Sequence, residues 1–238
     1  MIRLQGISKT LGTVQVFRDL SFTIEPGSIT CILGPSGCGK TTTLQMLAGL
    51  DQPDGGSITG QENLRPSYVF QEPRLLPWKT VEDNVHFVLK AHYEPAQRQQ
   101  LVDDYLERMS LTPYKKHYPN ALSGGMKQRL ALCRAFAFPH ELLLMDEPFK
   151  SLDAPLRFNL VKEVAKMWEM NGNTIIFVTH DIAEALLLGH KILVYSAKPT
   201  SVRAEFRIDQ PHAERDLGSP ELAGLFSDLL KMLESEYV

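Results

Sequence analysis

The chain has 238 residues, of which 43% are hydrophobic and 22% charged, and this composition suits one α/β domain with a substantial core. Its formal net charge of −3 gives no overall attraction to nucleic acid, and we interpret the scattered basic residues as solvated faces. Three cysteines without metal-like spacing, no basic-then-apolar leader and no apolar run of membrane-spanning length indicate a reducing cytosol and exclude membrane association except through a partner.

The first thirty residues predict antiparallel strands, because apolar side chains such as Phe22 and Ile24 alternate with polar ones. The pair Pro26 and Gly27 then marks a turn into a short apolar strand that begins at Ile29.

A glycine-rich loop follows this strand and precedes a predicted helix. Residues 34–41 (GPSGCGKT) fill the pattern G-x-x-x-x-G-K-[ST], in which glycines and a helix N-terminus turn backbone N–H groups toward an anion. Lys40 supplies a mobile cation, and the Thr41 hydroxyl is suited to Mg²⁺. A chance glycine-rich turn does not account for strand, loop and helix together, so we interpret the loop as a nucleotide phosphate site. Its candidate binding residues are Gly34, Pro35, Ser36, Gly37, Cys38, Gly39, Lys40, Thr41 and Thr42.

The next segment is rich in turns. The helix after Lys40 is predicted to end near Ala48 and Gly49, and residues 57–59 form a possible short strand. Residues 66–72 (PSYVFQE) predict a strand that ends in polar side chains. Gln71 is either an ordinary polar terminus or, beside the phosphate loop, an amide that holds Mg²⁺ or a water.

Helical patterns then replace the strands. Thr80 is a candidate cap for a helix from about Val81, with Asp83 three residues later, and residues 95–109 carry a helical charge pattern. We expect a small helical subdomain inserted at about residues 72–138.

A second candidate anion site lies at the start of a largely buried predicted helix. Ser123, Gly124 and Gly125 precede that helix, so its N–H groups and dipole are open to an anion. A simple helix cap explains Ser123 equally well. As an anion site, it could combine with the phosphate loop of a second copy, so that the two half-sites close on one ATP across a dimer.

The apolar run 142–145 (LLLM) predicts a strand buried on both faces of a parallel sheet. Its carboxyl end brings Asp146 and Glu147 into the crevice where open α/β sheets bind ligands. Two such carboxylates can divide the work, one in the Mg²⁺ shell and the other accepting a proton from the attacking water.

Residues 174–179 predict the next buried strand, and His180 follows it. The imidazole is either structural or, in this crevice, contacts the γ-phosphate or orients the water. A helix before this strand is expected to end at Gly172, and the remaining chain predicts a short helix, a strand near Lys191 and an amphipathic tail at residues 220–238. Because no repeat or linker interrupts the sequence, we expect one domain over residues 1–238, with a C-terminal helical tail at about 211–238.

The order of these motifs, with LSGGMKQ at residues 122–128, LLLMDE at 142–147 and SLD at 151–153, resembles the ATP-binding subunit of an ATP-binding-cassette (ABC) transporter over nearly the whole chain. The stretch QEPRLLPWKTVEDNV is similar to the nitrate/sulfonate/taurine importer branch of that family. No regulatory domain follows the cassette, which also fits that branch.

The resemblance implies an α/β fold: a P-loop NTPase core with a mostly parallel sheet, an N-terminal antiparallel β subdomain and a small helical signature subdomain. It implies ATP and Mg²⁺ as cofactors and a dimer in which residues 34–42 of one copy and 123–125 of the other enclose each ATP. The site roles that it assigns are the Mg²⁺ environment for Gln71 and Asp146, the general base for Glu147, the inter-subunit loop for Asp153 and the γ-phosphate switch for His180.

The resemblance also implies partners. It places the protein peripherally at the cytoplasmic face of the membrane, bound to transmembrane permease subunits. A solute-binding protein would be an indirect partner, and nucleic acid would not be a partner. Whether the cassette pairs with itself or with a related ATPase subunit stays open, as does the solute.

Three positions depart from the family pattern. Leu11 stands where many members have an aromatic residue that stacks on adenine, for which Phe17 is a possible substitute. Lys150 takes a position that is often small, and Met126 replaces the usual Gln of the signature.

The leading hypothesis is therefore an ATPase subunit that powers solute uptake. The alternatives are an exporter subunit, a non-transport cassette on DNA or ribosomes, and a P-loop kinase, although a kinase has no use for LSGGMKQ. Residues 72–88, with Leu75, Leu76 and Trp78, either pack onto the helical subdomain or receive a short helix of a membrane subunit.

Overall fold

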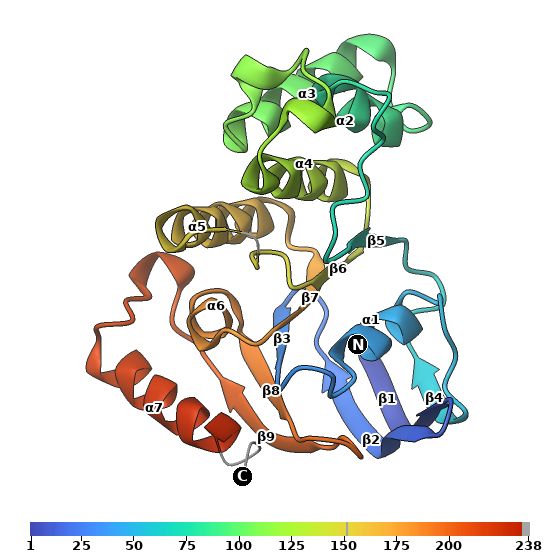
Figure 1. The fold of residues 1–238 in the computed structure, drawn as a ribbon, viewed down its shortest axis with the longest axis vertical. Helices are drawn as coiled ribbons and strands as arrows, with labels where there is room; N and C mark the ends of the chain where they lie inside the picture. Colours follow the sequence, from blue (N-terminus) through green and yellow to red (C-terminus); the bar gives the residue numbers. More distant parts are fainter. Residues whose placement is uncertain (151, 235–238) are drawn as a thin grey trace.

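A six-stranded sheet forms the centre of the computed structural model, which describes residues 1–150 and 152–234 (Figure 1). Its strand order is β5-β6-β7-β3-β8-β9, with every pairing parallel except that of β9 with β8. The strands span β3 (Ile29–Leu33), β5 (Pro66–Val69), β6 (Leu142–Asp146), β7 (Thr174–Thr179), β8 (Lys191–Tyr195) and β9 (Val202–Arg207).

The predicted N-terminal antiparallel strands form a separate three-stranded sheet in the order β2-β1-β4. It consists of β1 (Ile2–Leu11), β2 (Val14–Ile24) and β4 (Gly55–Thr59). Apolar side chains on one face of this sheet pack against the large sheet, where Leu144 and Ile176 contribute to the same cluster. The alternation seen in the sequence is therefore that of a sheet with one buried face.

The large sheet is buried on both faces, which explains its continuous apolar strands. Along β3, Cys31 and Leu33 belong to the cluster covered by helices, whereas Ile32 belongs to the cluster under the small sheet. The helices of the core are α1 (Lys40–Leu47), α5 (Ala154–Asn171), α6 (Ile182–Leu188) and α7 (Pro220–Glu234).

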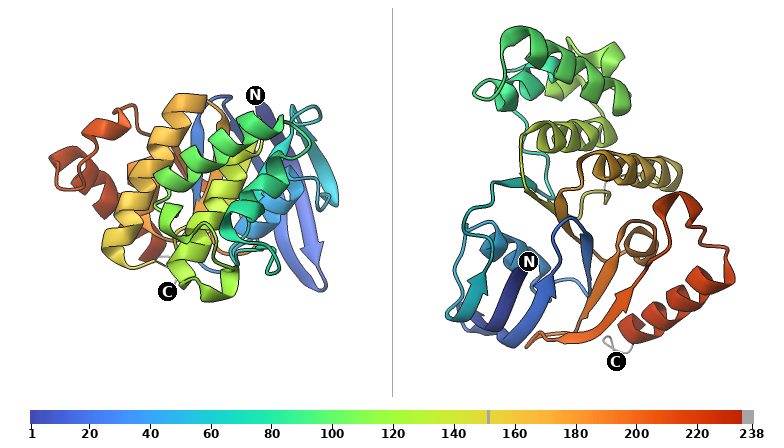
Figure 2. Two further views of the ribbon diagram at one scale, coloured as in Figure 1. Left: turned by 90° about the horizontal axis from the view of Figure 1, so that it is seen from above. Right: turned by 180° about the vertical axis from the view of Figure 1, so that it is seen from behind.

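Three further helices form a group at one end of the molecule, at the top of Figure 1 and again in the rear view of Figure 2. They are α2 (Val81–Leu89), α3 (Pro95–Arg108) and α4 (Gly124–Ala137), joined by the 3₁₀ turns η1 (Thr112–Tyr114) and η2 (Pro119–Ala121). Helix α4 joins this group to β5 of the large sheet through a hydrogen bond from the Ser67 hydroxyl to the Ala135 carbonyl. The Thr80 hydroxyl accepts a hydrogen bond from the Asp83 N–H at 3.2 Å, so the predicted cap of α2 is confirmed. The helices fall in the stretch 72–138, where we expect the inserted subdomain.

The C-terminal part follows the predicted order with one addition. Strand β9 lies at the sheet edge and, together with the 3₁₀ turn η3 (His212–Glu214), precedes α7. Two leucines of α7, Leu222 and Leu229, are fully buried, as an amphipathic helix requires. Ser151 of the SLD motif and tail residues 235–238 lie outside the described residues.

Candidate nucleotide-binding site

The phosphate loop joins the central strand β3 to α1. Gly37 and Gly39 have left-handed backbones, with φ of 78° and 111°. A Cβ at Gly39 would lie 2.6 Å from Val16 Cγ1 and 2.8 Å from the Phe17 ring, so only glycine fits this position. The loop therefore curls into a cradle and rests on side chains of β2.

Lys40 and Thr41 begin α1 directly beside this cradle. The Lys40 ammonium is buried and donates hydrogen bonds to the carbonyl oxygens of Gly34 (2.7 Å) and Pro35 (2.9 Å). A cation is thus held at the mouth of the loop, where the N-terminal N–H groups of α1 also favour negative charge.

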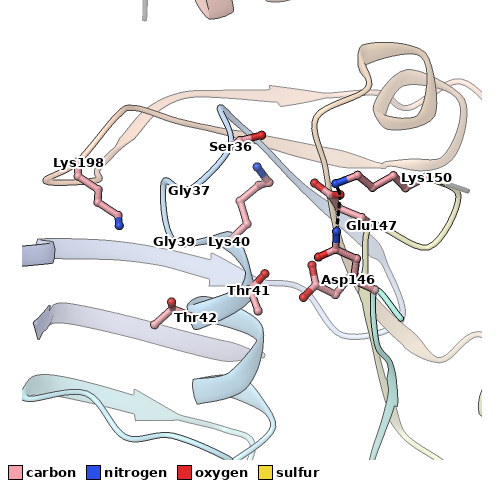
Figure 3. A pocket seen from close by; sticks show the side chains of 11 residues that line it. Ser36, Gly37, Gly39, Lys40, Thr41, Thr42, Asp146, Glu147, Lys150 and Lys198 are labelled. Atoms are coloured by element: carbon pink, nitrogen blue, oxygen red, sulfur yellow. Dashed lines mark hydrogen bonds and ion pairs between the residues drawn. The ribbon is translucent and has the colours of Figure 1, made fainter. Parts of the chain in front are cut away.

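A cavity of about 260 Å³ opens between the cradle and the end of β6 (Figure 3). Cations and carboxylates both line it, which is the composition needed for a polyphosphate with a divalent cation. Its lining residues are Ser36, Gly37, Gly39, Lys40, Thr41, Thr42, Gln71, Asp146, Glu147, Lys150 and Lys198.

Asp146 ends β6 and Glu147 follows it directly, as the apolar run predicts, and both are largely buried. Burial raises the pKa of Asp146, while hydrogen bonding by the Thr41 hydroxyl acts in the opposite direction. Glu147 has a left-handed backbone with φ of 45°, a strained conformation for a residue with a side chain. Its amide N–H donates to the Val178 carbonyl at 3.0 Å, which fixes this turn to β7.

Three polar side chains surround the Glu147 carboxylate. Its Oε2 lies 2.5 Å from the Lys150 ammonium and 3.5 Å from the Gln71 amide nitrogen, and its Oε1 lies 3.2 Å from His180 Nδ1. Burial would raise the pKa of Glu147, but Lys150 and His180 outweigh it and hold the net pKa below its usual value. The carboxylate is therefore kept ionised, as a proton acceptor must be.

The strand before Gln71 is shorter than predicted, because β5 ends at Val69. Gln71 consequently stands in the loop two residues beyond the strand, exposed at the cavity. From that position it reaches both the cavity and the segment that leads into α2.

Ser123 caps α4, and its hydroxyl accepts a hydrogen bond from the Met126 N–H at 3.3 Å. A Cβ at Gly124 would meet nothing within 4 Å, whereas one at Gly125 would lie 2.9 Å from Leu152 Cδ2. Ser123 and the two glycines do not line the cavity around Lys40. One copy of the chain thus does not bring its two candidate anion sites together.

Asp153, the other residue expected near a subunit interface, is exposed and caps α5 by accepting from the Leu156 N–H at 3.0 Å. The neighbouring Leu152 lies against Gly125. The loop that carries Asp153 is therefore packed beside the start of α4.

The prediction that Phe17 could stack on adenine is wrong. Its ring is fully buried beneath the phosphate loop, where it contacts the position of Gly39. Leu11 and Val14 are the exposed apolar residues of the β1–β2 hairpin, at 47% and 46% exposure.

Sequence reasoning missed two residues of the connection between β8 and β9. Lys198 lines the cavity opposite the carboxylates (Figure 3), and the Thr200 hydroxyl donates to the Cys38 carbonyl of the phosphate loop. Neither residue stands in a recognisable pattern. They lie near the phosphate loop because β8 pairs with β3, whose residues are more than 150 positions earlier in the sequence. Cys38 itself is buried, and burial raises the pKa of its thiol, which agrees with a filler role.

Residues 72–88 contain a strongly exposed aromatic side chain. Trp78 is 71% exposed, so the alternative that it packs onto the helical subdomain is wrong. Beside this segment, β5, α2 and α4 enclose a groove of about 290 Å³. Arg74 lies across its floor with the guanidinium 3.8 Å from the centre of the Phe70 ring.

Comparison with known proteins gives consistent results. The family model described as ABC transporter matches residues 17–150. An aliphatic sulfonates import ATP-binding protein of Bacillus cereus is 42% identical over 203 residues, covering 82% of this chain and 79% of that protein. A protein with the same description from Pseudomonas fluorescens is 36% identical over 240 residues, covering 98% and 87%.

Among solved structures, a dimeric ATP-binding cassette in a post-hydrolysis state, bound to ADP and Pi, superimposes with a TM-score of 0.77 at 28% identity. The match covers 88% of this chain and all of that one. The predicted fold class is thereby confirmed.

Proposed function

Because the chain belongs to the ABC transporter family and is an ATP-binding ATPase, we propose that it powers uptake of an aliphatic sulfonate through separate permease subunits. The observation that carries this proposal is the Glu147 carboxylate at the cavity formed by the phosphate loop, held between Lys150 and His180. The sulfonate assignment is supported by the Bacillus and Pseudomonas relatives, both described as aliphatic sulfonates import ATP-binding proteins.

In the proposed reaction, the phosphate loop and Lys40 hold the phosphates of ATP. The oxygen of a water forms a bond to the γ-phosphorus while the bond from this phosphorus to the bridging oxygen of ADP breaks. Glu147 takes the proton of the water, and His180, 3.2 Å from Glu147 Oε1, orients the carboxylate and contacts the departing phosphate.

The donor set beside Lys40 fits Mg²⁺. Thr41, Asp146 and Gln71 offer hydroxyl, carboxylate and amide oxygens around one cavity, and hard oxygen ligands are those that Mg²⁺ prefers. When bound, the ion neutralises charge on the phosphates, and these three residues would hold it.

A second copy completes the site in this proposal. Ser123 and Gly124 are exposed at the N-terminus of α4 and lie away from the cavity of their own chain. Placed against the cradle of a partner, they would give the far side of the nucleotide its own set of N–H donors. The dimeric cassette with 28% identity supports this assembly.

We place the permease contact at the groove beside β5 and at residues 72–88. Gln71 connects this surface to the cavity, and Trp78 offers a large exposed contact area. Among the described residues, no helix is long and apolar enough to cross a membrane. The protein would therefore reach the cytoplasmic face of the membrane through this surface, and a solute-binding protein would act on the other side.

The test is growth of a strain that lacks this chain on an aliphatic sulfonate as sole sulfur source. The wild-type chain restores growth, Glu147→Gln does not, and both strains grow on sulfate. Rescue by Glu147→Gln, or lack of a sulfonate defect in the deletion strain, would contradict the proposal. If the deletion strain is defective in the use of nitrate instead, the assignment as an importer subunit is retained and the solute is nitrate.

A further inference from the structure

Two lysines of the cavity are held by acceptors of the protein itself. Lys40 donates to loop carbonyls, and the Lys150 ammonium lies 2.5 Å from Glu147 Oε2 (Figure 3). Lys40 is held by backbone carbonyls, whereas Lys150 is held by the carboxylate that the proposed reaction needs as its proton acceptor.

This arrangement places a donor on each oxygen of Glu147. Its Oε2 faces Lys150 and the more distant Gln71 amide, and its Oε1 faces His180. A carboxylate that accepts a proton from water must offer an oxygen to that water within hydrogen-bond distance. Each oxygen keeps a lone pair for water, but the ammonium 2.5 Å from Oε2 crowds that oxygen and makes the carboxylate a weaker base. Opening the Glu147–Lys150 pair therefore clears Oε2 for water and strengthens Glu147 as a proton acceptor.

Lys150 can move without disturbing the core. Its side chain is 47% exposed, against 10% for that of Glu147, and it carries a flexible four-carbon stem with three N–H donors. It lines the same cavity as Lys40 and Thr41. The terminal phosphate of ATP carries more negative charge than one carboxylate, so ATP competes with Glu147 for the ammonium.

Building on the proposed function, we propose that Lys150 is a positioning residue that holds Glu147 in the nucleotide-free subunit and moves to the terminal phosphate of ATP. This exchange clears Oε2 of Glu147 for water only when ATP is present. ADP lacks the terminal phosphate, so it leaves the Glu147–Lys150 pair closed, and Lys150 distinguishes ATP from ADP.

The first experiment measures equilibrium affinities of the whole chain for ATP and ADP without divalent cation, so that no hydrolysis occurs. Lys150→Met weakens ATP binding about tenfold and leaves ADP binding unchanged, because only ATP gains the charged contact. Lys150→Arg retains the preference for ATP. The control Lys162→Met, an exposed lysine of α5 away from the cavity, retains both affinities.

The second experiment removes the competing carboxylate. Glu147→Gln tightens ATP binding several-fold by releasing Lys150, and this gain disappears when Lys150→Met is added. Equal effects of Lys150→Met on ATP and ADP, or no effect on either, would overturn the role of Lys150. A wild-type chain that binds neither nucleotide would overturn the proposed function as well.

Discussion

Individual side chains at the end of β6 carry the chemistry of the proposed site. Asp146 and Glu147 are adjacent in sequence, yet burial raises the pKa of Asp146 while Lys150 and His180 outweigh burial and lower that of Glu147. Such divergent environments are how two neighbouring carboxylates take different roles.

We therefore predict that Glu147→Gln lowers ATP hydrolysis about 10²–10⁴-fold without weakening ATP binding, since the amide cannot accept the proton. Turnover and ATP affinity of the same purified variant provide the measurement. ATP hydrolysis by Glu147→Gln at the wild-type rate would show that Glu147 is not the general base.

Lys40→Ala is expected to act on binding instead. It removes a charged contact worth about 1.5–3 kcal/mol, so ATP affinity itself falls. Unchanged affinity, measured by titration with ATP, would show that Lys40 does not contact the phosphates.

The motif residues of the site could be read from the sequence because each depends on local geometry, as Gly39 and Lys40 do at one loop. Two features could not. Phe17 is buried because the phosphate loop rests on it, and Lys150 reaches Glu147 through a non-helical turn that no periodicity describes.

At the scale of elements, the N-terminus of α6 carries a buried carboxylate. Glu184 lies in the first turn of α6 and is buried, with its Oε2 2.5 Å from the Thr179 hydroxyl. Burial raises the pKa of Glu184 to about 7, with Asp181 adding to the rise and the Thr179 hydroxyl and Arg157 opposing it.

This shift predicts a pH-dependent stability. Between the ordinary pKa of 4.5 and about 7 the folded chain holds the proton that the unfolded chain has lost, so stability falls as pH rises through this window. Glu184→Gln removes that loss, worth on the order of 3 kcal/mol. The unfolding temperature of the variant relative to that of the wild type should be higher at pH 8 than at pH 5. An equal difference between the two proteins at both pH values would contradict the assignment.

Buried strands were the easiest elements to predict, because β6 and β7 are apolar along their whole length. Strand β9 was missed although VRAEFR alternates half-buried residues with exposed charged ones, the pattern of a strand with one face on the core. The segment is only six residues long and lies at the sheet edge, where it pairs with β8.

At the scale of the whole molecule, the two helix starts proposed to bind ATP lie in different parts of the fold. The start of α1 faces the cavity in the core, whereas α4 belongs to the helical group above the sheets (Figure 1). Only a second copy, turned to face the first, would place both on one nucleotide.

The most direct test is the mass of Glu147→Gln in solution, measured by light scattering after size-exclusion chromatography with Mg-ATP. Blocked hydrolysis should trap a dimer of twice the mass of one chain, while ADP leaves the monomer. Adding Ser123→Arg, at an exposed cap where a larger side chain does not disturb the core, should abolish the dimer. A monomer with Mg-ATP, or a dimer that survives Ser123→Arg, would contradict an ATP site shared between two copies.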